Sequence, residues 1–149
     1  MVRITDACTP VTESDIQAFE THLNARLPEE YRQFLMQHNG GKPEPSVFRV
    51  DIDGFPNEDR ITCFLCLSDT EHDSLSRYLK KYRDRIPVNL LPIALPLAVD
   101  LVCLSISGDD YGTVYFWDHN WESDELDYTN VHFIAHSFNE LLNNLYPED

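Results

Sequence analysis

Positive charge is missing from the second part of this 149-residue chain: residues 86–149 contain no lysine or arginine but 11 aspartates and glutamates. The whole chain has a net charge of −15, so this part carries most of the imbalance. A field of one sign repels nucleic acid and anionic membranes and attracts cationic partners. The charge therefore disfavours nucleic-acid and membrane partners, although solubility alone is a simpler explanation for it.

Long apolar segments are also missing. The most apolar run, residues 90–106, is interrupted by Pro92, Pro96 and Asp100, and it is shorter than the roughly 20 residues that a membrane span needs. The first ten residues, MVRITDACTP, contain neither an apolar signal-peptide core nor a small-residue cleavage site. These absences predict a cytoplasmic protein without a membrane segment.

A signal peptide is missing too, and in such a chain the four cysteines are expected to be buried thiols rather than disulfides. Cys63 and Cys66 form a C-x-x-C pair, but on a β-strand this odd spacing places them on opposite faces. His132 and His136 lie too far along the chain to complete a zinc finger with them. We therefore predict no metal site and no cofactor.

Motifs of the common enzyme classes are absent as well. The chain has no Walker loop, no nucleophile elbow, no zinc-protease helix and no dinucleotide-binding fingerprint. We therefore predict that it is not an enzyme and has no catalytic residues. A less favoured alternative is a metal-dependent hydrolase in which Asp109, Asp110, Asp118 and His119 gather around a divalent ion. Turn formation explains the two adjacent aspartates more simply.

Hydrophobic periodicity, which the chain does have, predicts four helices. They begin near Thr12, at Pro28, near Thr70 and at Ser137. The second ends in HNGG, whose asparagine and glycines can take the left-handed conformation that closes a helix. The third should extend over residues 70–85.

Strands are predicted over residues 47–50 and 61–67, and then in the segments LLPIA, DLVCLSI, TVYFWD and VHFIA. The TVYFWD strand is largely apolar on both faces, so it should lie inside a sheet with helices on at least one face. The order of elements predicts an α+β fold. We expect a single domain over residues 1–149, with a core of about residues 12–146 and a mixed, mostly antiparallel sheet with helices packed on it.

The predicted third helix carries nearly half of the positive residues on its outer face. They are Arg77, Lys80, Lys81, Arg83 and Arg85. They form either a docking patch for acidic groups or a solvated face that offsets its acidic neighbours, and the second interpretation is the simpler one.

The segment 107–128 combines seven carboxylates with two tryptophans and three tyrosines and has no cation. Aromatic side chains anchor protein interfaces, and a charged rim speeds and orients the encounter with a partner. The predicted partner-binding residues all come from this segment: Asp109, Asp110, Tyr111, Asp118, Trp121, Glu122, Asp124, Glu125 and Asp127. Trp121 could instead fold back onto the sheet as a lid.

Three stretches carry a family resemblance: LPEEYRQFLMQHNGG at 27–41, LLPIA at 90–94 and DLVCLSISGDDYGTVYFWDH at 100–119. Together with a final helix containing FNELLNNL, they resemble the SUKH superfamily, proteins similar to the fungal Smi/Knr cell-wall-synthesis regulator. The resemblance implies a mostly antiparallel α+β fold. Its motif residues should be mainly scaffold: Leu27, Pro28, Tyr31, Phe34, Asn39, Gly40, Gly41, Gly108, Asp109, Gly112, Tyr115 and Asp118.

The resemblance also implies a role as an immunity protein that neutralises a cognate toxin of a contact-dependent or polymorphic toxin system. It brings no activity and no cofactor. Nuclease clefts are basic because they hold phosphate, so the acidic segment predicts a basic nuclease whose active or substrate-binding surface is masked. The alternative is an intracellular regulator or scaffold of the fungal type. The sequence leaves the toxin and the oligomeric state open.

Overall fold

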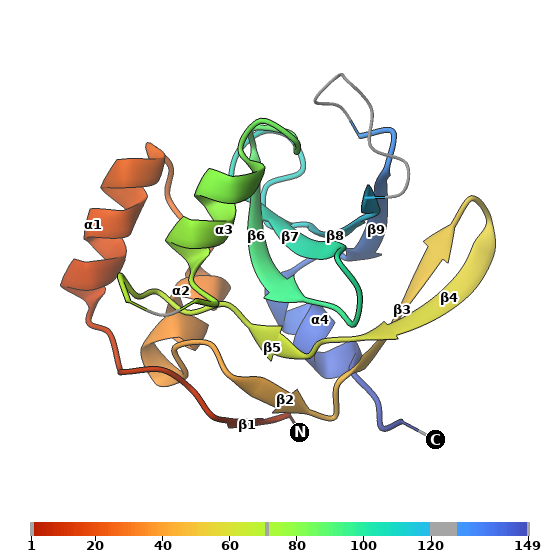
Figure 1. The fold of residues 1–149 in the computed structure, drawn as a ribbon, viewed down its shortest axis with the longest axis horizontal. Coiled ribbons are helices and arrows are strands. Elements are labelled where there is room, and N and C mark those ends of the chain that lie inside the picture. Colours follow the sequence, from red (N-terminus) through yellow and green to blue (C-terminus); the bar gives the residue numbers. More distant parts are fainter. Residues whose placement is uncertain (1, 71, 120–127, 149) are drawn as a thin grey trace.

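The computed structural model describes residues 2–70, 72–119 and 128–148 (Figure 1). The helices are α1 (Glu13–Leu23), α2 (Glu29–Gln37), α3 (Leu75–Tyr82) and α4 (Phe138–Asn144). The strands are β1 (Arg3–Thr5), β2 (Lys42–Glu44), β3 (Val47–Ile52), β4 (Phe55–Arg60), β5 (Cys63–Phe64), β6 (Leu90–Leu95), β7 (Leu101–Ser105), β8 (Val114–Trp117) and β9 (Val131–Ala135). None of the described helices is long and apolar enough to cross a membrane.

The main sheet has the strand order β5-β6-β7-β8-β9, and its paired strands are antiparallel. Two antiparallel ribbons, β1-β2 and β3-β4, accompany it. The β3-β4 ribbon contacts β9 through β3 and lies on the side of the molecule opposite α1 (Figure 1). This architecture confirms the predicted α+β fold class.

The inner strands β7 and β8 are buried on both faces. On β7, Val102 and Leu104 belong to one apolar cluster, whereas Leu101 and Cys103 belong to another. Side chains alternate across a strand, so these clusters lie on opposite faces of the sheet. The prediction that the TVYFWD strand lies inside the sheet is therefore confirmed.

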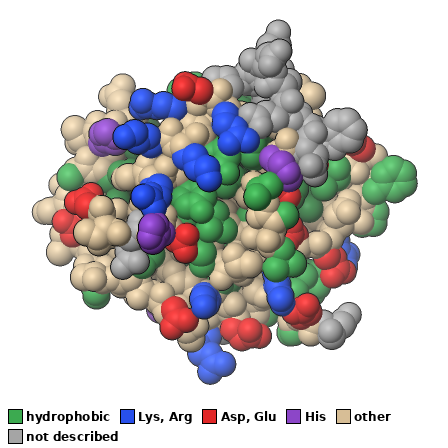
Figure 2. All heavy atoms as spheres, viewed as in Figure 1, with side chains coloured by type: hydrophobic (Ala, Val, Ile, Leu, Met, Phe, Trp, Pro, Cys, Tyr) green, Lys and Arg blue, Asp and Glu red, His purple; other side chains and the backbone are tan. Residues whose placement is uncertain are grey.

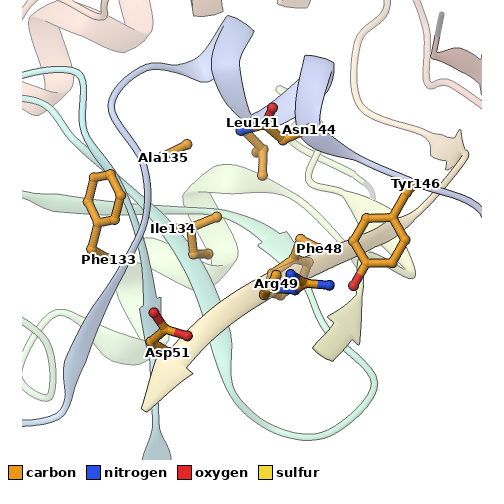
Figure 3. Close-up of a pocket in the computed structure, with 9 residues that line it drawn as sticks. All are labelled: Phe48, Arg49, Asp51, Phe133, Ile134, Ala135, Leu141, Asn144 and Tyr146. Atoms are coloured by element: carbon orange, nitrogen blue, oxygen red, sulfur yellow. The ribbon is translucent and has the colours of Figure 1, made fainter. Parts of the chain in front are cut away.

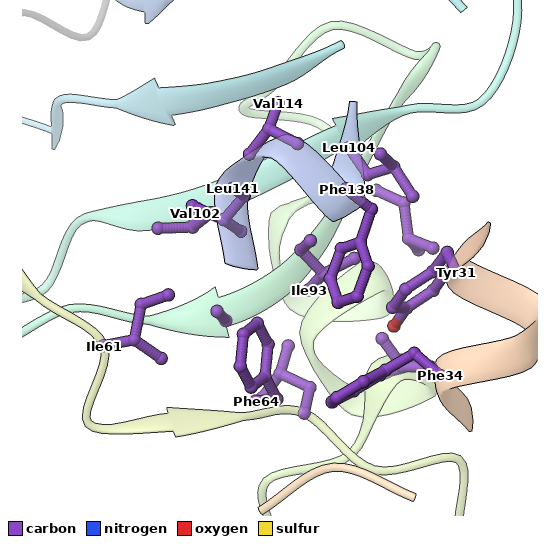
Figure 4. Close-up of a cluster of buried hydrophobic side chains, with 14 of the residues drawn as sticks. Tyr31, Phe34, Ile61, Phe64, Ile93, Val102, Leu104, Val114, Phe138 and Leu141 are labelled. Atoms are coloured by element: carbon purple, nitrogen blue, oxygen red, sulfur yellow. The ribbon is translucent and has the colours of Figure 1, made fainter. Parts of the chain in front are cut away.

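Helices cover both clusters. On one face, Phe34 of α2, Phe138 of α4 and Phe64 of β5 form a group of rings whose centroids are 4.9 to 5.7 Å apart (Figure 4). On the other face, the ring of Tyr82 at the end of α3 meets the indole of Trp117 edge-on at 5.6 Å. The sheet is therefore held between α2 and α4 on one side and the end of α3 on the other.

The helix starts follow the capping signals in the sequence. Thr12 and Asp15 form a capping box at α1, and the Ser137 hydroxyl accepts a hydrogen bond from the Glu140 amide at α4. The third helix is shorter than predicted, because Ser74 caps it and it begins at Leu75 rather than near residue 70.

The sequence did not predict β4, which pairs with β3 along its whole length. Asp53 and Gly54 form the connecting turn with φ angles of 54° and 88°, the left-handed conformation of a two-residue hairpin turn. β4 reads FPNEDR and is mostly exposed, so it lacks the apolar alternation that marks a half-buried strand. The short strands β1 and β2 were missed for the same reason.

The end of α2 joins the helices to β5. The side-chain amide of Asn39 donates to the Leu67 carbonyl at 3.0 Å and accepts from its N–H at 2.8 Å. Gly40 has a φ of 77°, and an added Cβ would lie 2.7 Å from the Cys66 sulfur. Only glycine fits this position. The predicted left-handed closure of α2 by HNGG is not observed, because the C-cap residue His38 is extended and Asn39 does not have a positive φ.

A disulfide joins Cys8 and Cys66, which corrects the expectation that the cysteines are thiols. The Cys8 amide donates to the Asn39 carbonyl at 2.9 Å, and this bond places the N-terminal segment beside Cys66. The two cysteines are 58 residues apart, and sequence spacing alone does not determine such connectivity. Cys63 and Cys103 are free, so the C-x-x-C pair does not act as a unit.

Cys8→Ser should lower the free energy of unfolding by about 2–4 kcal/mol without reductant, because the cross-link restricts the unfolded chain. Urea unfolding followed by circular dichroism measures this loss. Cys63→Ser, at a free thiol, is the control and should change stability little. Wild type in excess dithiothreitol should unfold like Cys8→Ser. Equal stability of wild type and Cys8→Ser without reductant would show that the two sulfurs remain thiols.

A buried cation joins α1 to α2. The side chain of Arg32 is 2% exposed and lies 3.2 Å from Glu20, 3.0 Å from Glu13 and 3.3 Å from Glu29, measured from nitrogen to carboxylate oxygen. Glu20 also accepts a hydrogen bond from the Leu27 amide at 2.7 Å. Buried charges persist when they are paired and hydrogen-bonded. These contacts therefore fix the position of the two helices.

Arg32→Met should destabilise the protein by about 3–5 kcal/mol, because it leaves the Glu20 carboxylate buried without its cation. Arg26→Met is the matched control. Arg26 is exposed and its contact with Glu29 is 3.4 Å long, so its loss should cost less than about 1 kcal/mol. Denaturant unfolding of both variants gives the comparison, and equal small losses would show that the buried pair contributes nothing.

Candidate functional site

The connection between β7 and β8, residues 106–113, brings the first predicted contact residues to one end of the main sheet. Gly108 and Gly112 both have a φ of 91°. The Gly112 amide donates to the Ser105 carbonyl, and the Ser105 amide donates to the Thr113 carbonyl, each at 2.9 Å. The predicted hairpin connection is confirmed.

Asp110 is the centre of a hydrogen-bond network at this connection. One of its carboxylate oxygens accepts from the Ser105 hydroxyl at 2.8 Å, and the other accepts from the hydroxyls of Tyr115 and Tyr128 at 2.7 Å each. The Asn89 side-chain amide in turn donates to the Tyr128 hydroxyl at 2.7 Å. Three hydroxyls thus hold this carboxylate against the protein.

The network shifts the proton equilibria of its members. Partial desolvation raises the pKa of Asp110, but hydrogen bonds from Tyr115, Tyr128 and Ser105 outweigh it, so this pKa lies below its ordinary value. Desolvation and the bond to Asp110 raise the pKa of Tyr128 to about 12, and the same causes raise the pKa of Tyr115. At neutral pH the network therefore consists of one anion and two neutral phenols.

Asp109 and Tyr111 flank Asp110 and are exposed. The ring of Tyr111 is 45% exposed, and its hydroxyl donates to the Arg26 carbonyl at 2.7 Å. This bond fixes the orientation of the ring on the surface. Among the predicted contact residues of the connection, these two offer accessible surface to a partner.

Asp118 lies beyond the opposite end of β8, roughly 13 Å of extended strand away from the connection. It is 7% exposed. Next to it, Asp100 accepts from the His119 amide at 3.0 Å and lies 2.6 Å from the His119 Nδ1 atom. Ligand atoms of Asp100, Asp118 and His119 lie within 4.8 Å of one another, close enough to surround a cation. Asp109 and Asp110 are not part of this group.

The other predicted contact residues lie outside the described part of the chain. They are Trp121, Glu122, Asp124, Glu125 and Asp127. Their contact with a partner stays a prediction. Trp117, from the same stretch of sequence, is fully buried in the core.

A groove of about 470 Å³ lies where β3, β9 and α4 meet (Figure 3). Its lining includes the 46%-exposed ring of Phe133 and the charged side chains of Arg49 and Asp51. The Arg49 guanidinium lies 6.0 Å from the centre of the Tyr146 ring. No sequence motif marked this groove, because its residues come from three distant segments that each look like ordinary strand or helix. Apolar and charged groups together are typical of a small protein-contact surface.

The two free thiols, Cys63 and Cys103, are not activated for nucleophilic chemistry. Desolvation, with a smaller contribution from Asp73, raises the pKa of Cys63 to about 11. Desolvation also raises the pKa of the buried Cys103. Both sulfurs are therefore protonated at neutral pH, whereas a nucleophilic cysteine needs a lowered pKa.

Comparison with known proteins identifies the family of this chain. A sequence model of the SMI1 / KNR4 family (SUKH-1) matches residues 10–144. The chain belongs to this family. The SUKH-1 chain is also 27% identical to the SPbeta prophage-derived uncharacterized protein YokK of Bacillus subtilis (strain 168), over 92% of this chain and 76% of that protein. The family includes toxin-immunity proteins and is not a known enzyme family.

In this SUKH-1 domain many of the motif residues serve the scaffold. Leu27, Tyr31 and Phe34 are buried at the junction of α1 and α2 and in the core. Tyr115 contributes to the network of Asp110. The sequence did not reveal that Asp110 itself would be held inward, because its hydroxyl partners come from β7, β8 and residue 128.

Asp110→Asn in this SUKH-1 protein should lower the free energy of unfolding at neutral pH by about 1–2 kcal/mol, because it weakens charge-assisted hydrogen bonds at a partly exposed site. The pKa of Asp110 is lower in the folded state than its ordinary 3.8. The ionised carboxylate therefore stabilises the fold above that value, and the contribution is lost as the pH falls through the folded pKa.

Urea unfolding at neutral pH and near pH 3 measures the difference between wild type and Asp110→Asn, which should shrink in acid. Asp109→Asn removes a neighbouring, exposed carboxylate and should change stability by less than about 0.5 kcal/mol. An equal loss for Asp110→Asn at both pH values would contradict the role of the charged network.

Proposed function

We propose that this protein is an immunity protein that neutralises a cognate toxin by covering its active or substrate-binding surface, with no chemistry of its own. The observation that carries the proposal is the complete absence of lysine and arginine from residues 86–149 in a member of the SUKH-1 family. That family includes toxin-immunity proteins.

Electrostatics support a cationic toxin, such as a basic nuclease. A cleft that holds phosphate is lined with positive side chains, and an acidic protein surface can occupy it. Asp109 supplies an exposed carboxylate, and the adjoining Tyr111 supplies an exposed ring that a hydrogen bond holds in place. The sequence predicts that Glu122, Asp124, Glu125 and Asp127 contact the same partner. Charge would speed the encounter and the aromatic rings would hold the complex.

Two other functions are less well supported. A regulator or scaffold of the fungal type is compatible with the same family, but it does not require an acidic half. A metal-dependent hydrolase built on Asp109, Asp110, Asp118 and His119 would need these side chains to converge. The described structure separates the first two from the last two by the length of β8.

Co-expression with the product of the gene directly upstream, which this proposal expects to be the toxin, tests the proposal. The protein should restore growth and co-purify with that toxin. The association rate should fall at least about tenfold between low and high ionic strength, because screening removes the attraction between the surfaces. Protection without binding, or a rate independent of salt, would contradict the electrostatic mechanism. Failure to protect or bind would favour the regulatory interpretation.

Neutralising five of the predicted contact acids should slow association with the toxin by about tenfold at low salt and change dissociation less. The substitutions are Asp109→Asn, Glu122→Gln, Asp124→Asn, Glu125→Gln and Asp127→Asn. A control variant changes the net charge by the same amount at exposed acids elsewhere, namely Glu44→Gln, Asp53→Asn, Glu58→Gln, Asp69→Asn and Asp84→Asn. Stopped-flow measurements compare the two. Equal slowing would show that total charge matters and the predicted surface does not.

A further inference from the structure

Positive charge gathers over α3 in a protein that is otherwise strongly acidic. Five of the 11 lysines and arginines lie within nine residues, and Figure 2 shows the group on one face of the molecule over this helix. The group comprises Arg77, Lys80, Lys81, Arg83 and Arg85. We call its four exposed members, Arg77, Lys80, Lys81 and Arg83, the α3 basic face.

The core fixes the position of this face. Leu75 and Tyr82 of α3 are buried, and Tyr82 packs against the fully buried Trp117 of β8. A helix anchored on its inner side holds its outer side chains at defined positions on the surface. The α3 basic face is therefore part of the rigid domain.

The cations of this face differ from most of the cations elsewhere in the described chain, although Arg3 and Arg49 likewise have no carboxylate of the described residues within 4.0 Å. Elsewhere, Arg26, Arg32, Lys42 and Arg60 each form an ion pair with a carboxylate. No carboxylate of the described residues lies within 4.0 Å of a charged nitrogen of the α3 basic face. In a protein with 26 acids and 11 bases, this local lack of pairing leaves positive charge available to a partner.

Aromatic rings lie beside two of the five positive side chains of this group. The Lys81 ammonium lies 5.4 Å from the ring centre of Tyr82 and 5.8 Å from that of Tyr78. The Arg85 guanidinium lies 4.7 Å from the ring centre of Tyr82 and 5.5 Å from that of Trp117. A cation–π contact orients a positive group without neutralising it. Lys81 therefore lies against two rings and not against a carboxylate of the described residues.

A hollow of about 680 Å³ lies beside the same side chains. Arg77, Lys80 and Lys81 line it together with His72 and the ring of Tyr78. Asp73 is the acidic residue in this lining, and one of its oxygens already contacts the Cys63 sulfur at 3.8 Å. The hollow therefore offers cations and an aromatic surface at the same place.

We propose that the α3 basic face binds an acidic segment of a protein partner. The helix has eight residues, which makes the face about 12 Å long, a match for a short peptide segment bearing a few carboxylates. Nucleic acid fits less well, because a duplex presents a phosphate charge about every 1.7 Å and would be repelled by a protein of net charge −15. This proposal does not depend on the toxin. The toxin is expected to be cationic and to meet the acidic surface, whereas the α3 basic face would bind an acidic segment.

A fluorescent glutamate-rich peptide of about a dozen residues, titrated with the full chain at low salt and followed by anisotropy, tests the proposal. Lys80→Glu/Lys81→Glu/Arg83→Glu should weaken binding at least about tenfold, because repulsion replaces attraction. Arg3→Glu/Lys42→Glu/Arg49→Glu is the matched control: it makes the same change in net charge at exposed positions and should leave affinity within about threefold of wild type. Circular dichroism confirms that each variant is folded.

Lys80→Ala/Lys81→Ala/Arg83→Ala provides a second, milder variant, which should bind with intermediate affinity. Absence of peptide binding by wild type would overturn the proposal, as would equal weakening in the glutamate variant and its control. If a DNA oligonucleotide binds more tightly than the peptide and its binding depends on the same residues, the α3 basic face would instead be a nucleic-acid surface. If wild type binds no peptide but self-associates, and the glutamate variant does not self-associate, the α3 basic face would instead be a contact between copies of the chain.

Discussion

The burial of β7 and β8 on both faces is the constraint on which the rest of the structure depends. Strands with apolar side chains on both sides need a cover on each side, so α2 and α4 pack on one face and the end of α3 packs on the other. The faces are thereby largely occupied, and both ends of these strands lie close to the surface. The connection at residues 106–113 and the group around Asp118 lie at those two ends, which makes them natural places for function.

Much of this framework could be predicted from the sequence. Capping residues and helical periodicity identified the positions of all four helices, and apolar segments identified β6 to β9. The missed parts lack such signals. β4 is polar and mostly exposed and is defined by its pairing with β3. The Cys8–Cys66 disulfide depends on the path of the N-terminal segment over Asn39, which no local pattern encodes.

The candidate site was less accessible to such reasoning, because it depends on contacts between distant residues. Asp110 looked like an exposed carboxylate, but the hydroxyls of Ser105, Tyr115 and Tyr128 draw it inward. His119 is adjacent to Asp118 in sequence, yet its hydrogen-bonding partner is Asp100, 19 positions earlier. Adjacent aspartates could be recognised as turn formers, whereas the direction of each side chain required the register of β7 and β8.

The packing of Trp117 makes this residue an intrinsic fluorescence probe. Its indole is fully buried, touches the ring of Tyr82 and lies near the Arg85 guanidinium. The emission colour and yield of an indole respond to water and to nearby charge. The chain has only two tryptophans, so changing Trp121 to phenylalanine leaves Trp117, beside the C-terminal end of α3, as the single tryptophan. The emission spectrum of Trp117 would report how α3 packs on the sheet, without any attached dye.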